Sequence, residues 1–248
     1  MTQKAAPDPR SFYNRVMPEK YGSDYESARW QANLFLSAQY RMMVDVMNRY
    51  VLPSAAHVTR VLEVGPGPGT WTKRLLAVNP SAQYTLVDIS SKMLSQAKGS
   101  LAGHTNVEFV ESDLLLFEAL QPYDFFFSSR AIEYMPDKPA VVQKIASSLV
   151  PGGCGAIVTK TPKPLFDRMR GRASSTLHSA QIQPGELMRL MRANGLVVEK
   201  VRIATATVPL LGSAALNESV YRLFRHFPLF FPLTLLSESY LVTFRKLA

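Results

Sequence analysis

The chain contains very little cysteine and no long hydrophobic run. Cys154 is the single cysteine among 248 residues, which excludes an intrachain disulfide and a cysteine metal cluster. No stretch approaches the roughly 20 apolar residues of a membrane-spanning helix. The polar residues 1–10 are not followed by the apolar segment of a signal peptide. We therefore expect a cytoplasmic protein without a bound metal, whose contact with a membrane, if it has one, is peripheral.

Charged side chains are also scarce, at 19% of the sequence, whereas hydrophobic residues make up 47%. This balance favours a folded chain with a buried core over a disordered one. Lysine and arginine outnumber the acidic residues, 28 to 19, which gives a formal net charge of +9. The positive excess permits attraction to nucleic acid, an anionic membrane or an acidic small molecule without choosing among them. The length suits one sizeable α/β domain over residues 1–248.

The motif with the clearest chemical meaning lies in residues 58–77. Branched apolar residues at 58–64 predict a strand, the glycines and prolines at 65–69 predict a tight turn, and residues 70–77 predict a helix. Glycine accepts positive φ angles and lets the backbone lie against a ligand, and a helix start offers free N–H groups. A turn of this kind after a buried strand is where open α/β sheets bind nucleotides.

The spacing of these glycines distinguishes two families of nucleotide-binding proteins. A dinucleotide fingerprint requires G-x-G-x-x-G. Gly69 comes one position too early for that pattern, and Thr70 occupies the position of its third glycine. With Glu63 in front, the sequence becomes E-x-G-x-G-x-G. This pattern resembles motif I of the class I S-adenosylmethionine-dependent methyltransferases.

Two acidic residues follow the next two expected strands. Asp88 comes directly after residues 83–87, and Asp113 follows residues 106–110. The resemblance implies that Asp88 accepts hydrogen bonds from the ribose hydroxyls and that Asp113 meets the adenine amine, since a carboxylate only accepts hydrogen bonds. The alternative is that each aspartate merely caps a following helix, because aspartate is a favoured N-cap residue.

The resemblance therefore implies S-adenosylmethionine as the cofactor and S-adenosylhomocysteine as its product. It places the cofactor over the glycine turn, with Glu63 either beside the methionine moiety or bracing the loop. The residues that it assigns to cofactor binding are Glu63, Gly65, Pro66, Gly67, Gly69, Asp88, Ile89, Met93, Ser112, Asp113, Leu114 and Ser129.

The expected elements alternate between strands and helices. Strands are predicted at residues 58–64, 83–87, 106–110, 123–128, 156–159, 196–203 and 240–245. Helices are predicted at residues 70–77, 138–149 and 184–193, and from residue 89 onward. Alternation predicts a mostly parallel sheet covered on both faces. The resemblance sharpens this to a Rossmann-like, doubly wound α/β fold with seven strands, the last antiparallel, and a cofactor-binding core over residues 54–160.

Residues 1–53 are expected to form a helical lid over the cofactor and substrate. Residues 23–26 have the S-x-x-E spacing of a capping box, apolar residues recur at helical spacing over 34–47, and Pro53 is predicted to end the helix. Alternatively, the aromatic side chains of this region only pack the helix against the sheet. Three of these aromatic residues are candidates for the wall of the site: Tyr13, Tyr21 and Trp30. Tyr21 is also a candidate substrate contact.

Residues 128–137 resemble the methyltransferase segment that passes beneath the reactive methyl group. Many members of that family have histidine near the positions of Glu133 and Tyr134, and this chain departs from that pattern. We take Glu133 and Tyr134 as candidate catalytic residues and Arg130 as a candidate substrate contact. The alternative is an Arg130–Glu133 pair at i, i+3.

Residues 161–248 are expected to supply the substrate side of the site. The basic loop at 160–172, which begins with Lys160, is suited to hold an anionic substrate or is simply solvated. His178 is the candidate general base because imidazole titrates near neutral pH, the alternative being a polar surface residue. The apolar insert at 209–237 is an interfacial membrane anchor, a wall of a greasy pocket, or a packing surface against the sheet or a second copy.

The function that we expect is transfer of a methyl group to an oxygen of a small or lipid-like acceptor. Such an in-line displacement depends on alignment and exclusion of water, so it requires neither a nucleophile triad nor a metal. One alternative is an RNA methyltransferase, suggested by the charge, although the sequence has no separate RNA-binding module and no N-P-P-Y or D-P-P-Y tetrad. Another is a non-catalytic protein that kept the cofactor-binding fold.

Overall fold

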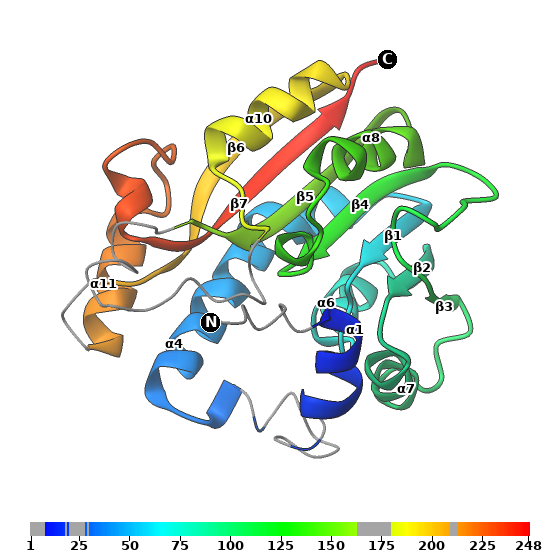
Figure 1. Cartoon of the computed structure of the whole chain (residues 1–248), viewed down its shortest axis with the longest axis horizontal. Helices are drawn as coiled ribbons and strands as arrows, with labels where there is room; N and C mark the ends of the chain where they lie inside the picture. The colour runs from blue at the N-terminus through cyan, green and yellow to red at the C-terminus, as the bar shows by residue number, and fades with distance from the viewer. Residues whose placement is uncertain (1–7, 18, 20–27, 29, 163–179, 209–212) are drawn as a thin grey trace, which may run out of the picture.

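The computed structural model describes residues 8–17, 19, 28, 30–162, 180–208 and 213–248 (Figure 1). Four sequence predictions lie outside the described residues: the capping box at 23–26, the substrate contact Tyr21, the general base His178, and the basic loop beyond residue 162.

A seven-stranded sheet forms the centre of the molecule, in the order β3-β2-β1-β4-β5-β7-β6 (Figure 1). The strands are β1 (Arg60–Val64), β2 (Gln83–Asp88), β3 (Val107–Glu111), β4 (Tyr123–Ser129), β5 (Leu149–Lys160), β6 (Leu196–Ala206) and β7 (Ser237–Lys246). Neighbours from β3 to β5 are parallel, whereas β7 is antiparallel to both β5 and β6. The predicted sheet with an antiparallel last strand is therefore confirmed.

The helical elements lie between and around these strands. They are α1 (Pro9–Ser11), η1 (Phe12–Val16), α4 (Leu34–Val46), η2 (Met47–Val51), α5 (Leu52–Ala55), α6 (Thr70–Val78), α7 (Ser91–Ser100), η3 (Ile132–Tyr134), α8 (Lys138–Ser148), α10 (Pro184–Ala193), α11 (Ala214–Phe224) and η5 (Leu233–Leu235). None of those described is long and apolar enough to cross a membrane.

Two hydrophobic cores lie on the two faces of the sheet. The alternation of side chains along β4 shows this division, because Phe125 and Phe127 belong to one core and Phe126 to the other, all fully buried. The first core includes apolar residues of α4, α6 and α11, and the second includes those of α8 and α10. Helices thus cover both faces, as the doubly wound prediction requires (Figure 1).

The prediction that Pro53 ends the N-terminal helix is wrong. The chain passes from α4 through one π-helical turn, η2, into α5, and Pro53 lies in the first turn of that last helix. A proline ring clashes with the carbonyl four residues earlier in a regular α-helix. Widening the preceding turn, in which Leu52 N donates to Met47 O, relieves that conflict and lets the helix continue.

The start of α4 and the boundaries of three strands also differ from the predictions. Asn33 is the N-cap of α4, and its side chain accepts a hydrogen bond from Leu36 N at 3.0 Å. Strands β6 and β7 are longer than predicted because they pair with each other along their whole length. Strand β5 is longer because residues 154–160 pair with β7 and Leu149 pairs with Tyr123 of β4. These antiparallel ladders continue to the edge of the site, where Lys160 lies opposite Ser239.

Candidate functional site

A cavity of about 490 Å³ opens at the carboxyl ends of β1, β2 and β4. Strand β1 lies between β2 and β4, so the order of the sheet reverses here, and ligands of open α/β sheets bind at such reversals. One wall comes from the glycine turn and the residues after β2 and β3. The other comes from residues 9–17, from the segment after β4, from three residues of α4 and from one residue each of β5, β6 and β7.

The glycine turn has the conformation that the sequence predicts. Gly65, Gly67 and Gly69 have φ angles of +71°, +56° and +87°, a region that other residues enter only with strain. At Gly65 a Cβ atom would lie 2.4 Å from Ala131 Cβ, so close packing also requires glycine there. A Cβ at Gly67 meets no atom within 4 Å, so the turn presents bare backbone at this position. Gly67 and Pro66 line the cavity, whereas Gly69 caps α6 behind it.

Glu63 braces the glycine turn from inside the protein. Its side chain is 1% exposed and does not line the cavity, and it accepts a 2.7 Å hydrogen bond from Thr72 Oγ1 in α6. Burial raises the pKa of Glu63 to about 8, with a further contribution from the charge of Asp88. Of the two roles that the sequence leaves open for Glu63, the structure supports the brace.

Asp88 lies at the end of β2 and faces the cavity. Gly67 N donates to its Oδ2 atom at 3.2 Å and Ser90 N to its Oδ1 atom at 2.9 Å. Burial raises the pKa of Asp88 to about 6, so the carboxylate is mostly ionised at neutral pH. Its hydrogen bonds fix its orientation and leave further lone pairs for a ligand. The cap of α7 is instead Ser90, whose hydroxyl accepts from Met93 N.

The ends of β2 and β3 place the remaining predicted cofactor residues along the same wall. Asp113 lines the cavity, and its side chain also accepts a 2.8 Å hydrogen bond from Leu115 N, which closes a local turn and does not cap a helix. The helix considered at residues 114–120 does not form; the segment makes turns instead. The other lining residues of this group are Ile89, Met93, Ser112 and Leu114.

The opposite wall follows β4. Ser129, Arg130 and Tyr134 line the cavity, and Arg130 has a φ angle of +62°, which turns the chain sharply after the strand. Arg130 Nε donates to Glu133 Oε1 at 2.7 Å, which confirms the i, i+3 pair. Thr159 Oγ1 donates to the other oxygen of Glu133 at 2.9 Å.

Glu133 itself is fully buried and is not among the cavity-lining residues. It is therefore placed to hold Arg130 in position, not to exchange a proton with a substrate, and this departs from the catalytic role predicted for it. Lys138 also fixes this segment, because its ammonium group donates hydrogen bonds to the carbonyl oxygens of Ile132 and Met135.

The N-terminal segment closes one side of the cavity. Tyr13 lines it, and its phenol oxygen lies 2.8 Å from that of Tyr134. The neighbouring Asn14 accepts hydrogen bonds from Ser90 Oγ at 2.7 Å and Lys92 N at 3.2 Å, which ties η1 to the start of α7. Trp30 has both roles considered for it, since it lines the cavity and packs against Tyr40 and Trp71.

Lys160, the predicted substrate contact at the end of β5, lines the cavity. Its ammonium group lies 3.8 Å from Glu238 of β7, which also lines the cavity. The sequence analysis missed Glu238, because only the pairing of β7 with β5 brings it there. It also missed several lining residues of α1, η1, α4 and β6: Pro9, Phe12, Leu36, Gln39, Met43 and Thr205.

Comparison with known proteins gives the class of the domain. Residues 61–153 match a family model described as a methyltransferase domain. The chain is 30% identical to a trans-aconitate 2-methyltransferase of Methylobacterium nodulans over 135 residues, 54% of this chain and 49% of that protein. It is 26% identical to a malonyl-[acyl-carrier protein] O-methyltransferase of Ilyobacter polytropus over 113 residues, 46% of this chain and 43% of that protein. The match thus spans about half the length of these relatives.

A solved structure extends the similarity over nearly the whole chain. The N-methyltransferase NodS from Bradyrhizobium japonicum, in complex with S-adenosylhomocysteine, aligns with a TM-score of 0.63 at 15% identity, covering 94% of this chain and 98% of NodS. At this identity the likeness shows the fold. The fold and the family model over residues 61–153 agree with the resemblance seen in the sequence to the class I methyltransferases, a class whose cofactor is S-adenosylmethionine.

Proposed function

We propose that this protein is an S-adenosylmethionine-dependent methyltransferase that methylates an oxygen atom of a small acceptor. The observation that carries the proposal is a single cavity wall on which the glycine turn, Asp88 and Asp113 come together, with Arg130, Tyr134 and Lys160 across from them. Two of the curated relatives act, by name, on trans-aconitate and on malonyl-[acyl-carrier protein], and the second is named as an O-methyltransferase.

The residues of the first wall fit the cofactor of the class. The ionised Asp88 carboxylate is suited to accept hydrogen bonds from vicinal ribose hydroxyls, and Asp113 is suited to accept one from an amine. Bare backbone at Gly67 allows close approach of a ligand, and the start of α6 behind it contributes a positive helix end. When bound, the cofactor supplies an electrophilic methyl group on a positively charged sulfur.

The residues of the second wall would align the acceptor and keep water out. The cavity, at about 490 Å³, has the size of a small-molecule pocket, so we assign only a small acceptor, or the end of a larger one, to it. Arg130 and Tyr134 lie on the turn that Glu133 and Lys138 hold. A fixed turn of this kind contributes to rate through orientation. Tyr134 remains our candidate for a group that contacts the acceptor, and His178 lies outside the described residues.

Calorimetric titration with S-adenosylmethionine and S-adenosylhomocysteine tests the cofactor site. We expect micromolar binding in the wild type and a loss of at least about tenfold in Asp88→Ala, since a charged hydrogen bond contributes about 1.5–3 kcal/mol. Glu111→Gln, an exposed carboxylate at the end of the neighbouring strand β3, is the matched control. Absence of binding in the wild type would contradict the proposal.

A methyl-transfer assay separates an enzyme from a non-catalytic protein of the same fold. Release of S-adenosylhomocysteine is measured with a panel of small carboxylic acids, hydroxylated lipids, amines and RNA. Turnover with an oxygen acceptor supports the proposal. Cofactor binding without turnover on any acceptor of the panel supports the non-catalytic alternative, and turnover on RNA alone supports the RNA alternative.

A further inference from the structure

The segment 222–232, at the end of α11 and directly after it, exposes large apolar side chains. Leu223, Phe227, Phe230 and Phe231 are 64%, 52%, 53% and 75% exposed. A large apolar side chain covers roughly 200 Å², so these four leave roughly 500 Å² of surface in contact with water. That is as large as the largest apolar patches on typical soluble monomers, about 300–600 Å², which often have a function.

This exposure does not result from a loosely attached segment. Tyr221 in the last turn of α11 is buried, and its phenol donates to Asp45 of α4 at 2.8 Å. Farther along, Leu229 N donates to Val201 O of β6 at 2.9 Å, and Leu233 is 8% exposed. The chain around this segment is therefore fixed to the rest of the protein on both sides, while Leu223, Phe227, Phe230 and Phe231 remain exposed to solvent.

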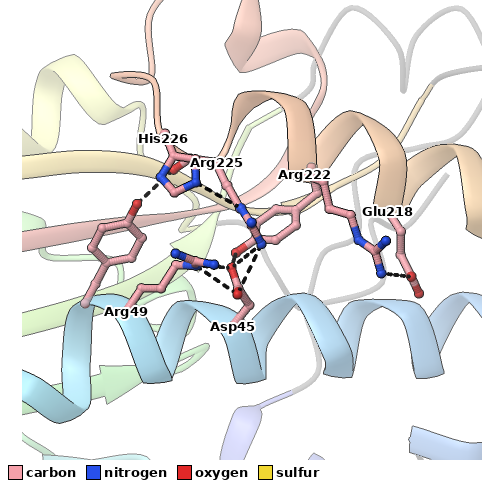
Figure 2. Close-up of polar contacts among 8 residues, drawn as sticks. Asp45, Arg49, Glu218, Arg222, Arg225 and His226 are labelled. Atoms are coloured by element: carbon pink, nitrogen blue, oxygen red, sulfur yellow. Dashed lines mark hydrogen bonds and ion pairs between the residues drawn. The ribbon is translucent and has the colours of Figure 1, made fainter.

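The helix that carries the segment is attached to α4 by charged groups (Figure 2). Asp45 accepts hydrogen bonds from Arg225 Nη1, at 3.2 Å to each oxygen, and from Arg49 Nε, at 2.9 Å. One turn away, Glu218 pairs with Arg41 and with Arg222. Each carboxylate thus has two arginine partners, so this helix pair carries an excess of positive charge.

Two of these arginines are exposed to solvent, and one of them directly precedes an exposed apolar residue of the segment. Arg222 is next to Leu223, and its side chain is 70% exposed; Arg41 is 58% exposed. Exposed arginines beside phenylalanine and leucine are typical of surfaces that bind at the headgroup level of anionic membranes. Pro228 and Pro232 keep the segment from forming a long helix, and so favour a shallow wedge.

We propose that residues 222–232, together with the arginines of the α4–α11 contact, form a docking surface for an anionic phospholipid bilayer. Leu223, Phe227, Phe230 and Phe231 insert at the boundary between the headgroups and the acyl chains, and Arg222 and Arg41 approach the lipid phosphates. A second copy of the chain fits this surface less well, because a symmetric dimer would bring two positively charged patches together.

Vesicle flotation of the full chain tests the proposal. We expect the wild type to float with vesicles of phosphatidylglycerol and phosphatidylcholine, to float less at high salt, and to remain unbound with phosphatidylcholine alone. In Phe227→Ser/Phe230→Ser/Phe231→Ser, bound protein should fall at least about tenfold, because the variant removes most of the apolar surface that would enter the bilayer. Arg222→Glu should weaken binding and reduce its salt dependence.

The matched control is Leu116→Ser/Leu120→Ser, which changes two side chains that are 79% and 100% exposed elsewhere on the surface and should leave flotation unchanged. Circular dichroism and S-adenosylhomocysteine affinity report whether the triple variant is folded, because its three residues do not line the cavity. Three results overturn the proposal: no flotation with anionic vesicles, equal flotation of wild type and triple variant, or a wild-type dimer by light scattering that the triple variant abolishes.

Discussion

The phenol oxygens of Tyr13 and Tyr134 lie 2.8 Å apart, although 121 positions separate these residues in the chain. Their rings meet edge to face, with centroids 5.7 Å apart. The contact connects the N-terminal segment to the turn after β4, and both residues line the cavity. The pair therefore closes one side of the site in which we place the cofactor and acceptor.

Removal of either phenol oxygen should open this side of the cavity. For Tyr13→Phe and Tyr134→Phe we expect weaker binding of S-adenosylhomocysteine, and a coupling energy of about 0.5–1.5 kcal/mol between the two changes in a double-mutant cycle. Calorimetry on the four proteins gives that value. Tyr50→Phe removes a phenol that bonds Arg225 O away from the cavity, and serves as the control. Strictly additive effects of the two changes would show that the pair does not act as a unit.

Cofactor binding should depend on the ionisation of Asp88. Burial raises the pKa of this carboxyl to about 6, and a protonated carboxyl accepts hydrogen bonds more weakly. Affinity should therefore be constant above about pH 7 and fall as the pH drops through 6. In Asp88→Asn the affinity should be lower at all pH values and should not change over this range. Calorimetric titrations from pH 5 to 8 check both statements, and an identical profile in the variant contradicts them.

Glu63 should make the protein less stable as the pH rises. Its folded pKa of about 8 lies above the ordinary glutamate value of 4.5, so the unfolded chain releases this proton first as the pH rises. The stabilisation is fully present below about pH 4.5 and is lost progressively up to about pH 8. Glu63→Gln keeps an acceptor for Thr72 but does not titrate. From pH 5 to pH 8, the free energy of unfolding of this variant should rise relative to that of the wild type by about 1 kcal/mol or more, since one pKa unit corresponds to about 1.4 kcal/mol.

Urea unfolding of the two proteins at pH 5, 6.5 and 8 measures that gain. Glu108→Gln replaces a carboxylate of β3 that takes no part in the turn, and should follow the pH dependence of the wild type. Parallel pH profiles for wild type and Glu63→Gln would show that the buried carboxyl does not titrate as we expect.

The two glycines of the turn should differ in their tolerance of alanine. Gly65→Ala introduces both a strained φ and a contact with Ala131, whereas Gly67→Ala introduces the strained φ alone. We expect a loss of about 1–3 kcal/mol for Gly67→Ala and a larger loss for Gly65→Ala. Thermal unfolding gives both values. Adding Ala131→Gly to Gly65→Ala should restore the part of the stability that the contact with Ala131 costs. If the double variant is no more stable than Gly65→Ala, the whole loss of stability comes from the strained backbone.

The local sequence determined the elements and the order in which they occur. The helix at 184–193 begins and ends where predicted, and the glycine turn has the positive φ angles that its composition requires. These features depend on near neighbours along the chain, so pattern and turn chemistry are sufficient to predict them. Pro53 shows where prediction from neighbouring residues fails. Proline inside a helix is normally taken as a helix end, but here the π-helical turn just before it removes the steric clash and the helix continues.

Only the tertiary structure decided which chemical groups share the site. Glu133 has a carboxyl group that could act as a catalytic acid, but it is buried and pairs with Arg130, so that its role is to hold Arg130 in position. Glu238 reaches the cavity only through the antiparallel pairing of β7 with β5. The sequence alone indicated the class of domain, since the order of the motifs can be read along the chain. Which side chains face a ligand depends on contacts between distant segments, and these exist only when the sheet has assembled.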